Sequence, residues 1–346
     1  MQRSRSLISV LKLLFTILLL FLVFQSIDIS KTSSDLSGFK WKSLVLLLVV
    51  CWLGQLLCSE RWRILAAALK MQGSYRSFVQ MYFAGMFFNI GLPSLIGGDA
   101  VKAYIVSRKN GKPLYVGLAS VLQDRAAGLI TLLLYGTIAI ILTPLSWRGL
   151  PLWVVYLAAW IGVVLALGLV LKGERLYSRF LIPGSRTLLQ KVLNMIADFH
   201  QALGNCDIQK GALLRVALYS FINSALVLWI FRQVTIAAGH EVSIVSFSAL
   251  YPLVTLATML PVTLSGLGVR EWFYVEALSL LGVPRNVGLC ISLATSALLL
   301  LCNLAGAVVL PCIPSELRHR ANLIEENADN PGKMMNDETK PLVRKG

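Results

Sequence analysis

The sequence predicts an all-α polytopic membrane protein, with about six full transmembrane helices and two re-entrant helical hairpins that form a pseudo-inverted repeat. Three observations predict this class. Hydrophobic residues make up 56% of the 346 residues and charged residues only 14%, and a mean hydropathy of +0.71 leaves too little polar surface to enclose a water-soluble core. Several apolar runs reach the roughly 20 residues that a helix needs to cross hydrocarbon. Two further long apolar segments are interrupted in the middle by Pro and Gly.

Full transmembrane spans are predicted from the uninterrupted apolar runs. The first run is followed by "QSIDISKTSS", which contains no small-x-small cleavage site, so we expect an uncleaved span rather than a signal peptide. The interrupted segments are 78–107 and 243–282, and the predicted membrane bundle takes up residues 1–312. The predicted full spans are 7–24, 43–59, 114–143, 152–171, 211–238 and 286–311.

The distribution of basic residues predicts the orientation of the bundle. If "MQRSRS" starts on the cytoplasmic side and each full span changes side, most of the 32 Lys and Arg residues fall in cytoplasmic loops. This asymmetry is the positive-inside bias, and it places both termini in the cytoplasm. The net charge of +15 does not indicate a nucleic-acid partner, because the basic residues are not gathered on one face with interleaved aromatics. On the external side we expect only Lys31, Lys40, Lys42, Arg148 and Arg285.

The polar parts of the chain give no indication of an enzyme or a metal centre. Residues 183–207 carry apolar side chains at helical spacing and predict a cytoplasmic amphipathic helix, and the polar tail 313–346 is expected to be disordered. We expect no soluble catalytic domain at either end, so any activity is assigned to the bundle. The six cysteines form no C-x-x-C pair, and His200, His240 and His319 lie far apart, so we expect no metal, disulfide framework or cofactor.

The first interrupted segment contains "FFNIGLPSLIGGDAVKAYIVSR", residues 87–108. Pro93 is expected to end one helix, Gly97 and Gly98 to allow a tight reversal, and Asp99 to act as the N-cap of the next helix. Treating the segment as a re-entrant hairpin keeps the basic cluster that follows it on the cytoplasmic side. Irregular backbone at membrane depth is tolerated only where protein or a water-filled cavity surrounds it, so the hairpin tip predicts a cavity.

The second interrupted segment repeats this pattern. Its motif "SGLGVRE", residues 265–271, contains Gly266 and Gly268, which we expect to form a hinge together with Pro261. Three full spans separate the two copies, so the second lies upside down relative to the first, as in the inverted repeats of secondary transporters, whose broken helices meet near the midplane. The residues that match at one constant spacing are Pro93 and Pro261, Gly98 and Gly266, Val101 and Val269, Lys102 and Arg270, and Tyr104 and Trp272.

Charged residues inside the predicted spans are candidates for substrate binding, because charges in hydrocarbon are costly and normally face the bundle interior. Lys102 and Arg270, together with two helix N-termini, would face one cavity and bind an anionic group such as phosphate. We expect Asp124, in "SVLQDRAAGL", to pair with Lys102 or Arg270 and to leave Arg125 free to reach substrate. The acidic candidates are also possible proton carriers. The predicted substrate-binding residues are Asn89, Asp99, Lys102, Asp124, Arg125, Arg270 and Glu271.

These residues also have purely structural interpretations. Arg270 and Glu271 can neutralise each other, and Lys102 and Arg125 can extend to the cytoplasmic headgroups. The motif "ERWR", residues 60–63, fits an interfacial anchor at the end of the second span. A role only as a helix cap or as a hydrogen bond between helices is open for Asp99 and Asn89.

Three ordered motifs resemble the transmembrane-region family of lysylphosphatidylglycerol synthases, which also occurs as stand-alone bacterial inner-membrane proteins. The motifs are the two quoted above, from residues 87 and 120 onward, and "LPVTLSGLGVREWFYVEALSLLGV", and the resemblance covers about residues 7–312. It implies a cytoplasmic (inner) membrane protein that moves lipid between leaflets, without the separate soluble domain that makes the lipid. Two departures leave the headgroup preference open: Lys102 stands where Arg is expected, and Ser265 stands where glycine is common.

Lipid translocation is the leading functional interpretation, and two others stay open. The protein would be a flippase rather than an enzyme, with anionic membrane lipids and a lipid-synthesising enzyme as its partners. No nucleotide-binding motif is present, so movement would be passive or ion-coupled. An integral membrane enzyme acting on a lipid phosphate is the first alternative, although the D-G-x-x-A-R run of phospholipid alcohol transferases is absent. The second alternative is an accessory subunit that presents lipid to a partner synthase.

Overall fold

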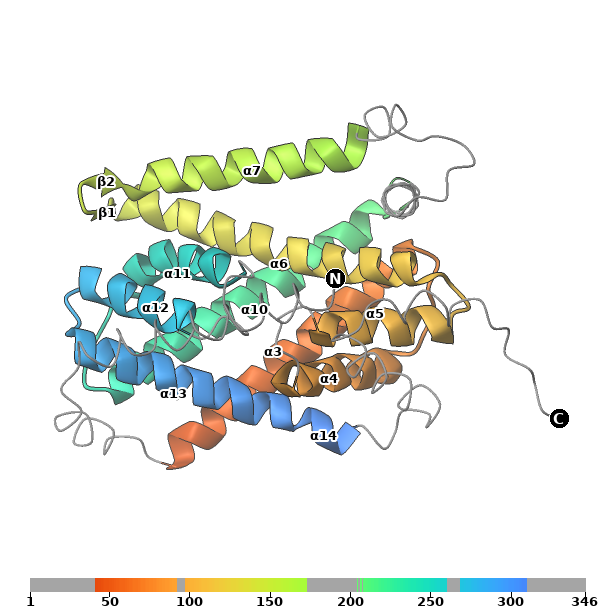
Figure 1. The fold of residues 1–346 in the computed structure, drawn as a ribbon, viewed down its shortest axis with the longest axis horizontal. Coiled ribbons are helices and arrows are strands. Elements are labelled where there is room, and N and C mark those ends of the chain that lie inside the picture. The colour runs from red at the N-terminus through yellow and green to blue at the C-terminus, as the bar shows by residue number, and fades with distance from the viewer. Residues whose placement is uncertain are drawn as a thin grey trace, which may run out of the picture.

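The structure is a computed structural model that describes residues 41–91, 97–172, 208–259 and 268–309, together with the single residues 204 and 206. These parts are mostly helical, and the helices pack beside one another as a bundle (Figure 1). The strands in them are β1 (Ser146–Trp147) and β2 (Leu150–Pro151), which pair antiparallel. Outside the described residues lie the predicted span 7–24, most of the predicted amphipathic helix 183–207, and the tail 313–346.

Within the described residues, four helices are long and apolar enough to cross a membrane. They are α3 (Trp41–Ala68), α6 (Leu114–Leu142), α10 (Lys210–Ala237), and α13 (Arg285–Leu304) continued by α14 (Gly306–Val309). Each overlaps a span predicted from its apolar length, and α3 extends beyond the predicted end at 59. A fifth helix, α7 (Leu152–Lys172), is also apolar and covers the predicted span 152–171.

Each interrupted segment folds as two helices. The first gives α4 (Tyr75–Gly91) and α5 (Gly97–Lys109), and the second gives α11 (Ile244–Met259) and α12 (Val269–Leu280). In both segments the two helices pack against each other. The connecting tips, 92–96 and 260–267, lie outside the described residues, and with them Pro93, Pro261 and Gly266.

The helices α4 and α5 run antiparallel and very close together. The Asn89 Oδ1 accepts a hydrogen bond from the Gly98 N–H at 2.9 Å near the tip, and the Lys109 Nζ donates to the Ser77 Oγ at 2.7 Å near the far end. A Cβ at Gly98 would collide with the carbonyl oxygen of Gly85. Glycine is therefore required at 98 for a backbone-to-backbone approach, the kind of contact through which membrane helices associate.

The helix α6 runs alongside the two broken segments and contacts both of them (Figure 1). Near its start, Gly117 packs directly on the Ala103 carbonyl of α5. Near its other end, Gly136 faces the phenol of Tyr156, whose hydroxyl donates to the Ala249 carbonyl of α11 at 2.8 Å. The two broken segments thus lie against opposite halves of one long helix.

Candidate functional site

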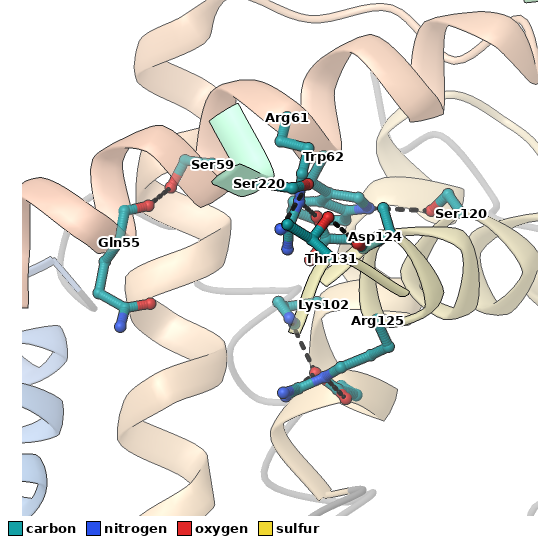
Figure 2. Close-up of polar contacts among 12 residues, drawn as sticks. Gln55, Ser59, Arg61, Trp62, Lys102, Ser120, Asp124, Arg125, Thr131 and Ser220 are labelled. Carbon is teal, nitrogen blue, oxygen red and sulfur yellow. Dashed lines mark hydrogen bonds and ion pairs between the residues drawn. The ribbon is translucent and has the colours of Figure 1, made fainter. Parts of the chain in front are cut away.

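The first broken segment and α6 together form an ion cluster. The Arg125 guanidinium on α6 donates to both oxygens of the Asp99 carboxylate, from Nε at 2.7 Å and from Nη2 at 2.9 Å. The Lys102 Nζ, one turn along α5, lies 2.8 Å from the Asp99 Oδ1. Figure 2 shows both cations directed at the same carboxylate. With one negative and two positive charges beside the N-terminus of α5, the cluster carries an excess of positive charge.

Asp99 does not act as the N-cap that the sequence predicted. It lies inside the first turn of α5, because the helix already begins at Gly97, and its carboxylate binds the side chains of Lys102 and Arg125. A carboxylate in the first turn still gains from the helix dipole. The helix starts earlier than expected, so the aspartate is free to hold two cations.

The two cations of this cluster differ in how accessible they are. The Lys102 side chain is 4% exposed, and its ammonium lies 4.3 Å from the centre of the Tyr82 ring and 5.7 Å from that of Trp62. Aromatic faces attract cations, so Lys102 is enclosed between these rings and Asp99 instead of extending to the headgroups. The Arg125 side chain is 41% exposed. The accessible cation of the cluster is therefore Arg125.

The expected partner of Asp124 is wrong. Its carboxylate binds neither Lys102 nor Arg270 but Arg61 of α3, whose Nε donates to the Asp124 Oδ1 at 2.7 Å. The Arg61 Nη1 also donates to the Ser220 Oγ of α10 at 3.1 Å. With side-chain exposures of 5% for Arg61 and 2% for Asp124, this is an enclosed ion pair that joins three helices (Figure 2).

The interpretation of "ERWR" as an interfacial anchor is also wrong. The helix α3 does not end near 59 but continues to Ala68, so Arg61 and Trp62 lie within it, and Trp62 is fully buried. The Trp62 Nε1 donates to the Ser120 Oγ of α6 at 3.0 Å. The apolar residues "ILAAAL" that follow the motif indicate in the sequence that the helix continues.

The second broken segment holds its charges differently. Arg270 donates to the Glu271 Oε1 from Nε at 3.1 Å and from Nη2 at 3.0 Å. The two residues therefore form the mutually neutralising pair that was one of the interpretations of the sequence. The Glu271 Oε2 accepts the Gly268 N–H at 2.6 Å, and Glu271 is only 1% exposed. Gly268 has a φ of +82°, a conformation that favours glycine, and it is the N-cap residue of α12.

The described part of the chain contains a cavity that is lined by residues other than those predicted to bind substrate. A cavity of about 90 Å³ lies between α3, α10 and α13, with Gln55, Asn223, Tyr251, Tyr274 and Thr295 among its lining residues. None of the predicted substrate-binding residues lines it. Within the described ranges, no group of three His, Cys, Asp or Glu side chains is placed to hold a metal ion.

The lysylphosphatidylglycerol synthase TM region matches residues 9–306. This chain belongs to that family. All the candidate residues, from Asn89 to Glu271, lie within the matched range. The family is a membrane domain, in agreement with the apolar helices of the bundle.

Two archaeal membrane proteins are similar to this member of the family. The UPF0104 membrane protein MJ1595 of Methanocaldococcus jannaschii is 21% identical over 300 residues, which are 82% of this chain and 88% of that protein. A UPF0104 membrane protein of Methanothermobacter thermautotrophicus is 24% identical over 249 residues, 66% of this chain and 72% of that protein. No solved structure matches the chain significantly.

Proposed function

We propose that this protein is a flippase that binds an anionic lipid headgroup at Arg125 and carries it between the two leaflets. The observation that carries the proposal is the Asp99–Lys102–Arg125 cluster. It has an excess positive charge, it adjoins a helix N-terminus, and Arg125 is partly exposed while its guanidinium fork already holds a carboxylate. Membership of a membrane-domain family of lipid synthases supports a lipid as the substrate.

The chemistry of the cluster suits a phosphate group. The guanidinium binds carboxylate and phosphate in the same bidentate geometry, so phosphate oxygens can take the places of the Asp99 oxygens on Arg125. Asp99 would keep its second partner, Lys102, during this exchange and would not be left as an unpaired charge. Release of the headgroup would restore the pair seen in Figure 2.

The two broken segments would form the path along which the headgroup crosses the membrane. In this proposal they are re-entrant hairpins of an inverted repeat, with α4 and α5 entering from the cytoplasmic side and α11 and α12 from the external side. Their position against opposite halves of α6 supports this arrangement. Headgroup transfer would be passive or coupled to protons, with Asp99, Asp124 and Glu271 as the candidate carriers, and Arg270 would meet the headgroup in the external half.

The proposed setting is a bacterial cytoplasmic membrane with both termini in the cytoplasm. The excess of basic residues in the loops assigned to the cytoplasm supports this orientation. A lipid-synthesising enzyme would then be a natural partner, because the chain itself is proposed to move lipid and not to make it.

The decisive experiment uses purified protein in liposomes that contain fluorescent lipids with different headgroups. We expect translocation of anionic phospholipids by the wild type and a strong reduction in Arg125→Gln, with a smaller reduction in Arg125→Lys, which keeps the charge but not the fork. The matched control is Arg285→Gln, which removes an exposed arginine paired with Glu276 outside the cluster. Unchanged translocation in Arg125→Gln would refute the proposal. Formation of a new lipid product without translocation would favour an enzyme.

A further inference from the structure

The helix α6 is fixed to its neighbours at two consecutive residues. Asp124 pairs with Arg61 on α3, and Arg125 pairs with Asp99 on α5. Consecutive residues of an α-helix point about 100° apart, because one turn takes 3.6 residues. The direction of the Asp124 side chain therefore determines where the Arg125 side chain can point.

The contact between α3 and α6 extends beyond this single pair. Ser120, one turn before Asp124, accepts a hydrogen bond from the Trp62 indole at 3.0 Å. At Gly128, one turn after Asp124, a Cβ would lie 3.4 Å from the Arg61 Nη1, an ordinary contact, so this position also faces the guanidinium. Positions 120, 124 and 128 form one stripe, since residues four apart share a helix face. The stripe fixes both the height and the rotation of α6 against α3.

Stability alone does not explain why this ion pair is buried. A buried ion pair is often no more stable than well-packed apolar side chains of similar volume, because both ions lose their hydration. An ion pair with hydrogen bonds also restricts the orientation of its partners. The Arg61 guanidinium has to reach Ser220 on α10 as well as Asp124 on α6, so only a narrow range of α6 rotations satisfies both contacts. Methionine at 61 and leucine at 124 would leave the rotation of α6 less restricted, because apolar contacts have no preferred direction.

We infer that Arg61 and Asp124 are positioning residues for the anion site, holding α6 in the one rotation that presents Arg125 to Asp99. The inference rests on the proposed function of Arg125 as the headgroup ligand and extends it to a second pair of residues. With α6 held by α3 and α10, an anion that takes Arg125 from Asp99 displaces α5 and α4 and does not rotate α6. The α3–α6–α10 group is then the static frame, and the first broken segment is the moving part.

The test measures binding of a fluorescent phosphatidylglycerol to the full chain in detergent micelles, with a fluorescent diacylglycerol, which lacks the phosphate, as the comparison ligand. In the variant Arg61→Met with Asp124→Leu, the charges are replaced by apolar side chains of similar size. We expect a folded protein whose affinity for phosphatidylglycerol falls roughly ten- to hundredfold, as for the loss of a hydrogen bond to a charged group, while diacylglycerol binding is unchanged. Ser59→Ala is the matched control, because this buried hydroxyl of α3 bonds only to the Gln55 carbonyl of its own helix.

A second measurement separates positioning from general damage. In the Arg125→Gln background, the Met and Leu substitutions should lower phosphatidylglycerol affinity no further, because they act through Arg125. If the two losses multiply, Arg61 and Asp124 act independently of Arg125 and the inference is wrong. Should the double variant not fold, Arg61→Lys keeps the charge, and we expect an intermediate loss with the same dependence on Arg125.

The outcomes distinguish this inference from the function on which it rests. If Arg125→Gln alone leaves phosphatidylglycerol binding unchanged, the proposed anion site is wrong. If Arg125→Gln weakens binding but the Met and Leu substitutions do not, the anion site stands and the positioning role is refuted.

Discussion

The two broken segments share a sequence pattern but not a charge arrangement. In the first, the cation Lys102 and the carboxylate Asp99 are joined by Arg125 from another helix, so the cluster stays positive and partly open. In the second, Arg270 pairs with the adjacent Glu271, whose carboxylate is buried and also caps the Gly268 N–H. Under the proposed function, the position of the counter-charge, and not the repeated cation, decides which segment receives the anion.

The largest expected effect is on stability and concerns the two carboxylates. Asp99→Asn leaves the 4% exposed Lys102 without its partner, and we expect the free energy of unfolding to fall by about 3 kcal/mol. Glu271→Gln should lower it by only about 1 kcal/mol, because the amide oxygen can still accept the Gly268 N–H. Equilibrium unfolding in mixed micelles measures both values. Equal losses would show that the two segments depend on their carboxylates in the same way.

The second effect is on transport and concerns Arg125 and Arg270, the two arginines proposed to meet the headgroup. Arg125→Gln should slow translocation of an anionic phospholipid roughly ten- to hundredfold, the loss expected for a charge-assisted contact with the headgroup. Arg270→Gln should have the smaller effect, because Glu271 already neutralises Arg270. The liposome assay with fluorescent lipids compares the two variants directly. A larger loss for Arg270→Gln would reverse the comparison and move the binding site to the second segment.

A third test compares the packing of the segments. Gly98→Ala places a methyl group against the Gly85 carbonyl, and we expect a loss of about 1–3 kcal/mol in unfolding free energy from overpacking. Gly288→Ala, on α13 beside α12, should be neutral or stabilising by up to about 1 kcal/mol, because the new Cβ lies 3.5 Å from the Val275 Cα, an ordinary contact. Thermal unfolding of both variants checks the difference. Tolerance of alanine at 98 would mean that α4 and α5 can separate easily.

The smallest expected effect is a null result. The Sγ atoms of Cys51 on α3 and Cys302 on α13 are 2.9 Å apart, and both thiols are free. If the first segment moves against a static frame, oxidising this pair to a disulfide should leave translocation unchanged, with Cys302→Ser under the same oxidant as the control. Mass spectrometry verifies the cross-link. Inhibition by the cross-link would show that α13 also has to move against α3.

The sequence predicted the helices well because their signal is local. Apolar length located α3, α6, α7, α10 and α13, and Pro and Gly marked the two interruptions. The small hairpin at β1 and β2 was not predicted, although Arg148 and Gly149 at its turn both have positive φ, as a two-residue hairpin turn requires. A two-residue strand leaves no alternating pattern that could have indicated it.

The ion pairs were predicted less well because they are not local. Asp124 was recognised as a buried charge, but its partner Arg61 comes from a helix 63 positions earlier, and no spacing rule connects the two. Arg61 was assigned to the membrane surface because a charge near the end of an apolar run usually lies there. Asp99 and Lys102 were each recognised as candidates on one helix but were not paired with each other, and the contact of Arg125 with Asp99 depends on the packing of α5 against α6.

The helix α7 gives the bundle an edge that is governed by the bilayer. Among the described elements its main contacts are with α6 and the adjoining strand β2, and Trp153, Leu157, Ile161 and Leu165 on it are exposed. Its 21 residues extend about 32 Å, close to the roughly 30 Å of a typical hydrocarbon core. A thicker or thinner membrane would change the tilt of α7 first, because few protein contacts oppose it. Lipid chain length is thus an external variable that acts on this molecule through α7.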